Sequence, residues 1–225
     1  MFIIYIKRYW MGSIVKLIAD TLGYVLSFVC PLNIFSLFRA LLSHVYTGFL
    51  RKRFGTFGKG ALIAYKAQNL HGLNTIFIGE RTKISQGAQL TTWESADGKQ
   101  GIIRIGQNCN IRDYVHITSV RNIKIGNNLL TGTNVLITDN SHGKTDYHNM
   151  CIAPDEREIV SKGSVTIGDN VWIGNNVCIM PGVKVGDGVI IGANSIVTKD
   201  IPNYCVAAGI PAKIIRINKD VFHET

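Results

Sequence analysis

The chain has few cysteines, and their number and spacing exclude several classes of protein. The chain has 225 residues but five cysteines, an odd number, and no two of them form a Cys-x-x-Cys motif. This pattern excludes the disulfide framework of a small secreted protein and does not indicate a zinc site. Cys109, Cys178 and Cys205 lie in apolar runs, where a small buried side chain is the simpler interpretation. A reducing, cytoplasmic compartment fits this usage.

Long hydrophobic runs are also lacking. The longest candidate span, residues 17–38, is interrupted by Asp20, Pro31 and Asn33, and its clean apolar part is residues 22–30. A membrane-spanning helix needs about 20 predominantly apolar residues. No small-residue cleavage site follows a clean apolar core, as a secretory signal would require. The sequence therefore does not predict a transmembrane helix here.

Acidic residues are nearly absent from the first 60 positions. This segment holds eight basic side chains and one acid, Asp20, a balance of +7, whereas residues 61–225 hold 16 basic and 14 acidic side chains. The net charge of +9 suggests an anionic partner, and nucleic acid is the first candidate. No basic stripe with interleaved aromatic residues follows residue 60, so nucleic-acid binding is disfavoured.

Helical spacing marks the second half of this N-terminal segment. After Pro31, apolar residues recur at helical intervals and lead into a basic cluster: Ile34, Leu37, Phe38, Leu41, Leu42, Val45 and Phe49, then Arg51, Lys52 and Arg53. An amphipathic helix that ends in basic residues is typical of docking on an anionic membrane surface. The alternative is a helix packed on its own domain or on a neighbouring subunit. We expect residues 1–53 to include such a segment, and a peripheral position at the inner face of the cell membrane.

The rest of the chain is dominated by a repeat of six residues. From Val165 it reads VTIGDN, VWIGNN, VCIMPG, VKVGDG, VIIGAN and SIVTKD, with aliphatic residues at every sixth position. A period of six fits neither a helix nor a simple strand, but it fits a short extended stretch followed by a turn. The glycine, asparagine and aspartate residues of each row suit the turn, which accounts for the 23 glycines.

Similar rows begin at 76, 82, 88, 103, 109, 115, 123, 129 and 135, which makes fifteen rows in all. Three rows close one triangular coil, so we expect about five coils of a parallel β-helix. The interruptions, residues 94–102, 121–122 and 141–164, each follow a third row and should leave the prism at one edge. Trp172 falls between two inward positions and should face outward. We expect an apolar and basic segment over residues 1–58, the β-helix over 59–200 with a loop at 141–164, and a C-terminal strap and tail over 201–225.

These rows resemble the hexapeptide-repeat acyltransferase family, whose fold is a left-handed β-helix. The resemblance covers roughly residues 60–217, is strongest in VLITDNSHG, VTIGDNVWIG and IIGANSIVTKDIPNYCVAAGIPAKIIR, and points to bacterial sugar O-acetyltransferases such as those that modify surface polysaccharides, with galactoside and maltose acetyltransferases as relatives. It implies a homotrimer, with acetyl-CoA bound between neighbouring subunits and no resident metal.

Acetyl transfer to a hydroxyl needs one base with a pKa near neutrality, and histidine fits. His142 stands in Asp139-Asn140-Ser141-His142-Gly143, at the start of the long loop, where a packing histidine is unexpected. The resemblance places the catalytic base at this motif position. Asp139 or Asn140 is a candidate to orient the imidazole, although turn formation alone explains both residues.

Acceptor contacts are expected near the same edge. His116 should point outward, since its neighbours 115 and 117 point inward, and Trp93, at the first interruption, offers a ring on which a sugar could stack. Asp113, on an adjoining turn, is a weaker candidate of the same kind. For each, an idle surface position is the alternative.

The resemblance also carries over the contacts to coenzyme A. They are Asn175 after WIG, Ala193 in IIGAN, Thr198 and Lys199 in VTKD, and Lys213 and Arg216 in PAKIIR. Lys213 stands where the galactoside enzymes tend to carry arginine, which would allow a single phosphate contact but not a bidentate one. A solvated tail is the alternative for Lys213 and Arg216.

Other functions remain open at this stage. One is N-acetylation of an amino-sugar nucleotide or an antibiotic, and another is a non-catalytic prism that binds a glycan. A metal-dependent relative, the γ-type carbonic anhydrase, needs a close histidine pair, whereas His142 and His148 are six residues apart and His116 lacks a partner on its own coil. The sequence therefore favours an acetyl-CoA-dependent O-acetyltransferase that acts on a sugar hydroxyl.

Overall fold

The computed structural model describes residues 2–28, 34–95 and 97–218, and in the first helix the side chains from Ser13 onwards. The end of the expected C-terminal tail, residues 219–225, lies outside these ranges. The chain divides into two compact units, Met1–Leu41 and Leu42–Thr225. The first unit contains helix α1 (Phe2–Ser27) and the start of helix α2 (Ile34–Leu50), and a short 3-10 turn, Arg51–Arg53, follows α2. Within the described residues, no helix combines the length and apolar character needed to cross a bilayer.

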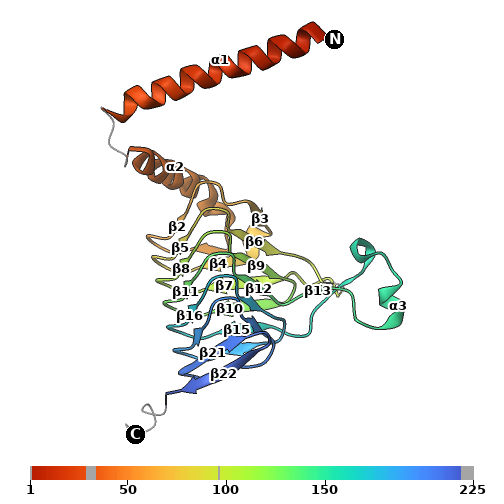
Figure 1. Ribbon diagram of the computed structural model, residues 1–225. Coiled ribbons are helices and arrows are strands. Elements are labelled where there is room, and N and C mark those ends of the chain that lie inside the picture. Colours follow the sequence, from red (N-terminus) through yellow and green to blue (C-terminus); the bar gives the residue numbers. More distant parts are fainter. Residues whose placement is uncertain (1, 29–33, 96, 219–225) are drawn as a thin grey trace. The chain divides into compact units, whose positions relative to one another are not determined.

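Three parallel sheets form the sides of a triangular prism (Figure 1). Sheet A contains β1 (Thr56–Phe57), β4 (Ile76–Ile78), β7 (Ile102–Ile105), β10 (Asn122–Ile125), β15 (Val165–Ile167) and β18 (Lys184–Val185). Sheet B contains β2 (Leu62–Ile63), β5 (Lys83–Ile84), β8 (Asn110–Ile111), β11 (Leu130–Thr131), β16 (Trp172–Ile173), β19 (Ile190–Ile191), β21 (Cys205–Gly209) and the antiparallel β22 (Ala212–Ile217). Sheet C contains β3 (Asn69–His71), β6 (Gln89–Thr92), β9 (His116–Ser119), β12 (Leu136–Thr138), β17 (Cys178–Ile179) and β20 (Ile196–Val197).

Each coil takes one strand from each sheet, and all fifteen predicted rows coincide with strands. The predicted left-handed parallel β-helix is confirmed. The structure adds one coil, formed by β1, β2 and β3, to the five that the rows predict. Its inward positions, Phe57, Ile63 and Leu70, are not evenly spaced, because one extra residue precedes Leu70. That slip hides the first coil from a search for a strict period of six.

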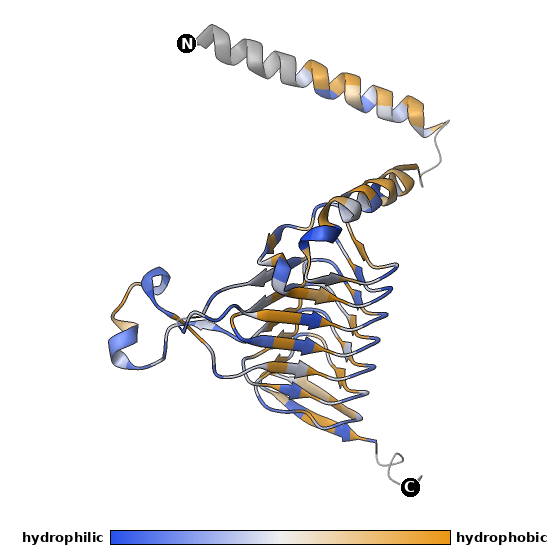
Figure 2. Ribbon diagram, turned by 180° about the vertical axis from the view of Figure 1, so that it is seen from behind, coloured by the Kyte–Doolittle hydropathy of each residue, from blue (hydrophilic) through white to orange (hydrophobic). Residues whose placement is uncertain are grey.

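The interior of the prism is filled by the two predicted aliphatic series. Ile167, Ile173 and Ile179 of one series, and Val165 and Val171 of the other, are buried. Strand residues between them, such as Thr166, Trp172 and Lys184, are half-buried or exposed, and several strands in Figure 2 change between hydrophobic and hydrophilic colours along their length. Trp172 is 52% exposed, so its predicted outward orientation is confirmed.

The edge between sheets A and B, the A–B edge, is built from tight turns with left-handed backbone. Asn108, Asn128 and Asn170 hold positive φ angles there, which asparagine tolerates better than most residues. A side-chain oxygen of each coil also accepts a backbone N–H from the coil before it: Asn127 from Gln107, Asp169 from Asn127, Asp187 from Asp169, and Asn203 from Asp187. At Gly106 a Cβ would overlap the carbonyl of Gly126 in the next coil. The A–B edge is therefore continuous and tightly stacked.

Helix α2 closes the first coil with its hydroxyl side chains. The Thr47 hydroxyl donates to the carbonyl of Ile63 at 3.0 Å and accepts from the Ile63 amide at 2.9 Å. The Ser43 hydroxyl accepts from the amide of Tyr65 at 3.0 Å. These groups of the first coil have no preceding coil to bind, so α2 satisfies them in its place.

Candidate functional site

The chain leaves the prism at one edge, between sheet C and sheet A, which we call the C–A edge. The interruptions lie between β6 and β7, between β9 and β10, and between β12 and β15. The prediction that all of them share one edge is confirmed. The longest one forms a two-stranded ribbon of β13 (Ser141–His142) and β14 (Ile159–Val160), with the short helix α3 (Tyr147–Met150) at its far end. Figure 1 shows this excursion reaching out from the side of the prism.

His142 lies on the ribbon and its side chain is exposed. It pairs with Ile159 across the ribbon, and the next residue, Gly143, donates its amide to the carbonyl of Glu158 at 2.9 Å. Gly143 has a φ of 77°, and a Cβ there would clash with the side chain of Arg157. Arg157 in turn donates to the carbonyl of Ile152 at 2.9 Å. The local sequence thus holds the histidine on a braced ribbon with its imidazole open to a ligand.

Asp139 has a different task from the predicted orientation of the imidazole. Its carboxylate is fully buried and accepts the Ser119 hydroxyl at 2.7 Å and the amides of Val120, Arg121 and Asn122 at 2.8–3.0 Å. These donors belong to the preceding coil, where β9 turns into β10. Among the described residues, the imidazole of His142 donates no hydrogen bond to this carboxylate. Asp139 therefore fixes the turn at the base of the ribbon.

Asn140 also serves the base of the ribbon. Its side-chain amide donates to the carbonyl of Thr118 at 3.2 Å, and its backbone amide donates to the hydroxyl of Thr138 at 3.1 Å. It thereby ties the start of the ribbon to sheet C. Neither Asp139 nor Asn140 contacts His142 through a hydrogen bond in the part of the chain that the structure describes.

Sheet C carries His116 on its outer face, as predicted. Val115 and Ile117 on either side are buried, and His116 lies in register with Gln89 and Leu136 of the neighbouring strands. Burial lowers the pKa of the His116 imidazole below its ordinary value, because the charged form loses solvation. A neutral imidazole at this position can donate one hydrogen bond and accept another.

Trp93 lies where the chain first leaves the prism. Its ring stacks on the ring of His71, with centroids 4.1 Å apart and planes at 17°, and the side chain remains 36% exposed. His71 is held by a 2.8 Å contact between its Nδ1 and the carbonyl of Thr92. One face of the indole is therefore already occupied, which leaves the other face and the edge for an acceptor.

Asp113 lies elsewhere, on the turn between sheets B and C, the B–C edge. Its carbonyl accepts the amide of Asn134 at 2.9 Å. Sheet C separates this turn from the edge that carries His142. In one chain, His116 thus lies on sheet C and Trp93 at the C–A edge from which the ribbon leaves, whereas Asp113 lies on the opposite edge of sheet C.

A pocket of about 280 Å³ lies at the C–A edge between the two excursions. It is lined by Ser95, Asp97, Val120, Arg121, Lys144, Glu158, Ile159, Val160 and Ser161. Hydrogen bonds from Ser95 and Lys99 lower the pKa of Asp97 to about 2. The pocket has both polar and apolar walls and adjoins strand β14, the partner of the strand that carries His142.

The predicted coenzyme contacts fall in three places. Asn175 and Ala193 lie on the B–C edge in successive coils, and the carbonyl of Asn175 accepts the amide of Asn194 at 2.8 Å. The side-chain oxygen of Asn175 is already engaged by the amide of Thr133 at 2.9 Å. Thr198 and Lys199 follow β20 at the C–A edge and are exposed.

Lys213 and Arg216 lie on β22 and are exposed. Lys213 pairs with Ala208 and Arg216 with Val206, because a bulge in the register occurs between Val206 and Ala207. Without that bulge, residues three apart would point to opposite faces. The bulge therefore places both cations on the same outer face of sheet B.

A buried polar column in sheet C was missed by the sequence analysis. Thr91, Thr118 and Thr138 lie in register on adjacent strands and are all buried, and the hydroxyl of Thr91 has no hydrogen-bond partner among the described residues. The sequence does contain a sign of this column. The third row of three coils reads QLTT, HITS and LITD, with polar residues where other rows have a turn. These side chains lie beside the base of the C–A excursions.

Metal-binding groups are a separate matter. In the described ranges, no cluster of three or more histidine, cysteine, aspartate or glutamate side chains is placed to hold a metal ion.

Comparisons with known proteins agree with this architecture. The family model "Bacterial transferase hexapeptide (six repeats)" matches residues 164–199. A putative lipopolysaccharide biosynthesis O-acetyl transferase, WbbJ of Escherichia coli strain K12, is 42% identical over 130 residues, which are 56% of this chain and 64% of the relative. The galactoside O-acetyltransferase of the same strain is 39% identical over 133 residues, 52% of this chain and 65% of the relative. The matched region thus spans slightly less than two thirds of these relatives.

Solved structures support the same fold. An N-acyltransferase from Bacillus cereus, AntD, superposes with a TM-score of 0.63 at 22% identity, covering 77% of this chain and 88% of the other. A hexapeptide-repeat acetyltransferase from Vibrio cholerae, solved with acetyl-CoA, superposes with a TM-score of 0.53 at 26% identity, covering 77% and 76%. The resemblance to hexapeptide-repeat acyltransferases is confirmed.

Proposed function

We propose that this chain transfers the acetyl group of acetyl-CoA to a hydroxyl of a sugar, within a surface polysaccharide or its lipid-linked precursor, and that His142 is the general base. The observation that carries the proposal is the placement of His142. It is an exposed imidazole on a braced ribbon, at the edge where the prism is interrupted. No packing role accounts for a histidine at such a position.

The names of the relatives support the proposed reaction and the proposed class of acceptor. Two of them, at 42% and 39% identity, are named as O-acetyltransferases, one of a galactoside and one of lipopolysaccharide biosynthesis. The Vibrio cholerae structure was solved with acetyl-CoA, which supports acetyl-CoA as the donor here. We therefore favour a sugar hydroxyl over an amine as the acceptor.

The reaction needs only one side chain to accept and return the proton. His142 removes the proton from the acceptor hydroxyl as that oxygen attacks the thioester carbonyl. The resulting imidazolium then returns the proton to the departing thiolate, and the acetyl ester and free coenzyme A are released. No covalent enzyme intermediate is needed, so a Ser-His-Asp arrangement is not required.

The candidate coenzyme contacts support a site shared between subunits. Asn175 and Ala193 lie on the B–C edge, whereas His142 lies on the ribbon at the C–A edge of the same chain. One chain therefore does not gather the whole set around one cleft. We propose a homotrimer in which the B–C edge of one subunit, with its coenzyme, faces the ribbon of the next.

Acceptor profiling with the purified full-length chain tests this function. Loss of thioester absorbance is the suitable readout, because thiol reagents would also react with the exposed Cys151. Glycosides, amino sugars and lipid-linked sugars are supplied with acetyl-CoA, and the products are identified by mass. We expect thioester loss that depends on a sugar hydroxyl and yields a base-labile ester.

Two outcomes would contradict the proposal. A base-stable amide formed on amino sugars alone would indicate N-acetylation. Glycan binding without thioester loss, with every acceptor, would indicate a non-catalytic prism.

A further inference from the structure

Helix α2 buries small polar side chains and exposes large apolar ones, which is the reverse of the usual arrangement. Its buried residues are Ser43, Thr47 and Leu50, and two of these are the hydroxyl residues that close the first coil. Its large apolar side chains are instead exposed: Ile34, Phe35, Leu37, Phe38, Leu41, Val45 and Phe49. Phe38, Leu41, Val45 and Phe49 follow helical spacing and so share one side of α2. Helix α2 thus has an apolar face, and Val45 and Phe49, which belong to the same unit as the prism, are not covered by it.

Positive charge borders this face. The turn directly after α2 is Arg51, Lys52 and Arg53, all exposed, and Lys59 follows. Across the first 60 residues there is one acidic side chain, Asp20, against eight basic ones. An apolar face flanked by cations and almost free of anions complements the surface of an anionic bilayer.

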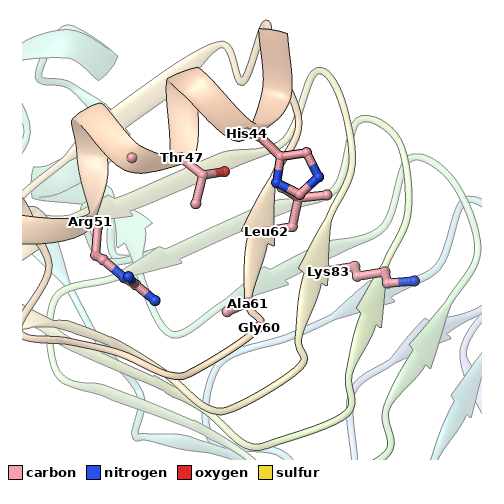
Figure 3. Close-up of a pocket in the computed structure, with 8 residues that line it drawn as sticks. His44, Thr47, Arg51, Gly60, Ala61, Leu62 and Lys83 are labelled. Atoms are coloured by element: carbon pink, nitrogen blue, oxygen red, sulfur yellow. The ribbon is translucent and has the colours of Figure 1, made fainter. Parts of the chain in front are cut away.

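A pocket of about 500 Å³ adjoins the same helix, between α2 and the first two coils. Figure 3 shows His44 extending from α2 and Arg51 from the turn that follows it, with Gly60, Ala61 and Leu62 of the first coil beside them and Lys83 on the neighbouring strand β5. None of the eight residues that line it is acidic. Arg51 and Lys83 make the lining of this pocket positively charged, which suits a phosphate group.

We propose that α2 lies on an anionic membrane surface, with its exposed apolar face in the interfacial layer and the phosphate of a lipid headgroup in the pocket lined by His44, Arg51 and Lys83. The apolar residues supply the hydrophobic part of the binding free energy, and the cations select anionic lipid. This docking is independent of the acetyl transfer proposed above.

Sedimentation of the full-length chain with vesicles tests the proposal. One set of vesicles is phosphatidylcholine alone and the other contains phosphatidylglycerol as well. We expect at least about tenfold tighter binding to the anionic vesicles, and loss of that binding at high salt, because each basic residue near such a surface contributes about fivefold.

Two double variants separate the contributions. Leu41→Gln with Val45→Gln removes apolar area from α2, and Arg51→Gln with Lys83→Gln removes two cations from the pocket. Each should weaken binding to the anionic vesicles by about tenfold or more. All four positions are exposed, so the thermal unfolding transition should not move by more than a few degrees. Transfer to a soluble glycoside should be unchanged in both variants.

Two matched control variants remove the same kinds of side chain from surfaces away from α2. Tyr147→Gln with Met150→Gln removes exposed apolar side chains from the distal loop, and Lys124→Gln with Lys184→Gln removes two charges from the outer face of sheet A. Both should bind anionic vesicles within about twofold of the parent chain.

Several results would overturn the proposal. They are no vesicle binding at all, equal binding to neutral and anionic vesicles, or equal losses in the pocket variant and its charge control. If Leu41→Gln with Val45→Gln leaves vesicle binding intact but lowers the molecular mass in solution, the helix face is covered by a second copy and the proposal is wrong.

Discussion

Two edges of the same prism are built in opposite ways. At the A–B edge, the turns share one backbone conformation, with a residue at positive φ that is asparagine in three of them, and from Asn127 onwards one side-chain oxygen accepts one amide of the coil before it. At the C–A edge, the turns differ from coil to coil, and one buried carboxylate, that of Asp139, accepts four donors. The regular edge divides its stabilisation among many equivalent contacts. The interrupted edge concentrates its stabilisation in a few residues and leaves His142 exposed.

The largest effect should come from the ribbon at the C–A edge. His142→Ala should lower the turnover number by about 10²- to 10⁴-fold, because the acceptor hydroxyl would lose its base. The free energy of unfolding should be unchanged, since the side chain is exposed. Steady-state kinetics and chemical denaturation measure the two quantities. Retention of a third of the activity would show that another group removes the proton.

The next effect compares one carboxylate from each edge. Asp139→Ala should lower the free energy of unfolding by about 4 kcal/mol, because four donors would lose a buried, charged acceptor. Asp187→Ala, at the A–B edge, removes the acceptor of one amide and should cost about 1 kcal/mol. Urea denaturation of both variants gives the difference. Equal losses would mean that the two edges do not differ as described.

A smaller effect isolates the backbone of the A–B edge. Asn170 has a φ of 57°, so Asn170→Ala should destabilise the chain by about 1–2 kcal/mol. Asn170→Gly keeps access to that conformation and loses only the contact with Asn128, so it should cost less than half as much. If the two variants unfold at the same denaturant concentration, strain at this turn does not matter.

The smallest effect concerns the coenzyme at the C–A edge. Lys199→Ala should raise the KM for acetyl-CoA by about fivefold and leave the KM for the acceptor unchanged, since the lysine is exposed and screened by solvent. Lys184→Ala, on the outer face of sheet A, is the matched control and should change neither constant. An equal rise in both variants would remove Lys199 from the site.

Most of the prism could be predicted because its interior admits one kind of residue at fixed intervals. Every coil repeats the same inward positions, so a row such as VTIGDN shows both the strand and the turn that follows. The first coil was missed because a one-residue slip before Leu70 breaks the period. Regular spacing is thus readable from sequence only where the coils are uniform.

The candidate site was less predictable, because its contacts join residues far apart in the chain. The acidic side chain beside His142 suggested an orienting partner, but Asp139 instead binds amides 17–19 residues earlier. Counting rows is sufficient to place Asp113 on the B–C edge. Its distance from His142, however, depends on the width of sheet C, which the sequence does not show. The common face of Lys213 and Arg216 depends on a bulge that no local pattern announces. The roles of all these residues remain predictions.

The closure of the first coil by Thr47 and Ser43 also sets the length of the molecule. A stack of coils has no intrinsic stopping point, because its last strand offers the same backbone groups as every strand before it, and identical chains could add to it end to end. Here the Ile63 amide and carbonyl are already bound by a side chain, and at the other end β22 turns back antiparallel along β21. The parallel stacking of coils in sheet B therefore stops at both ends.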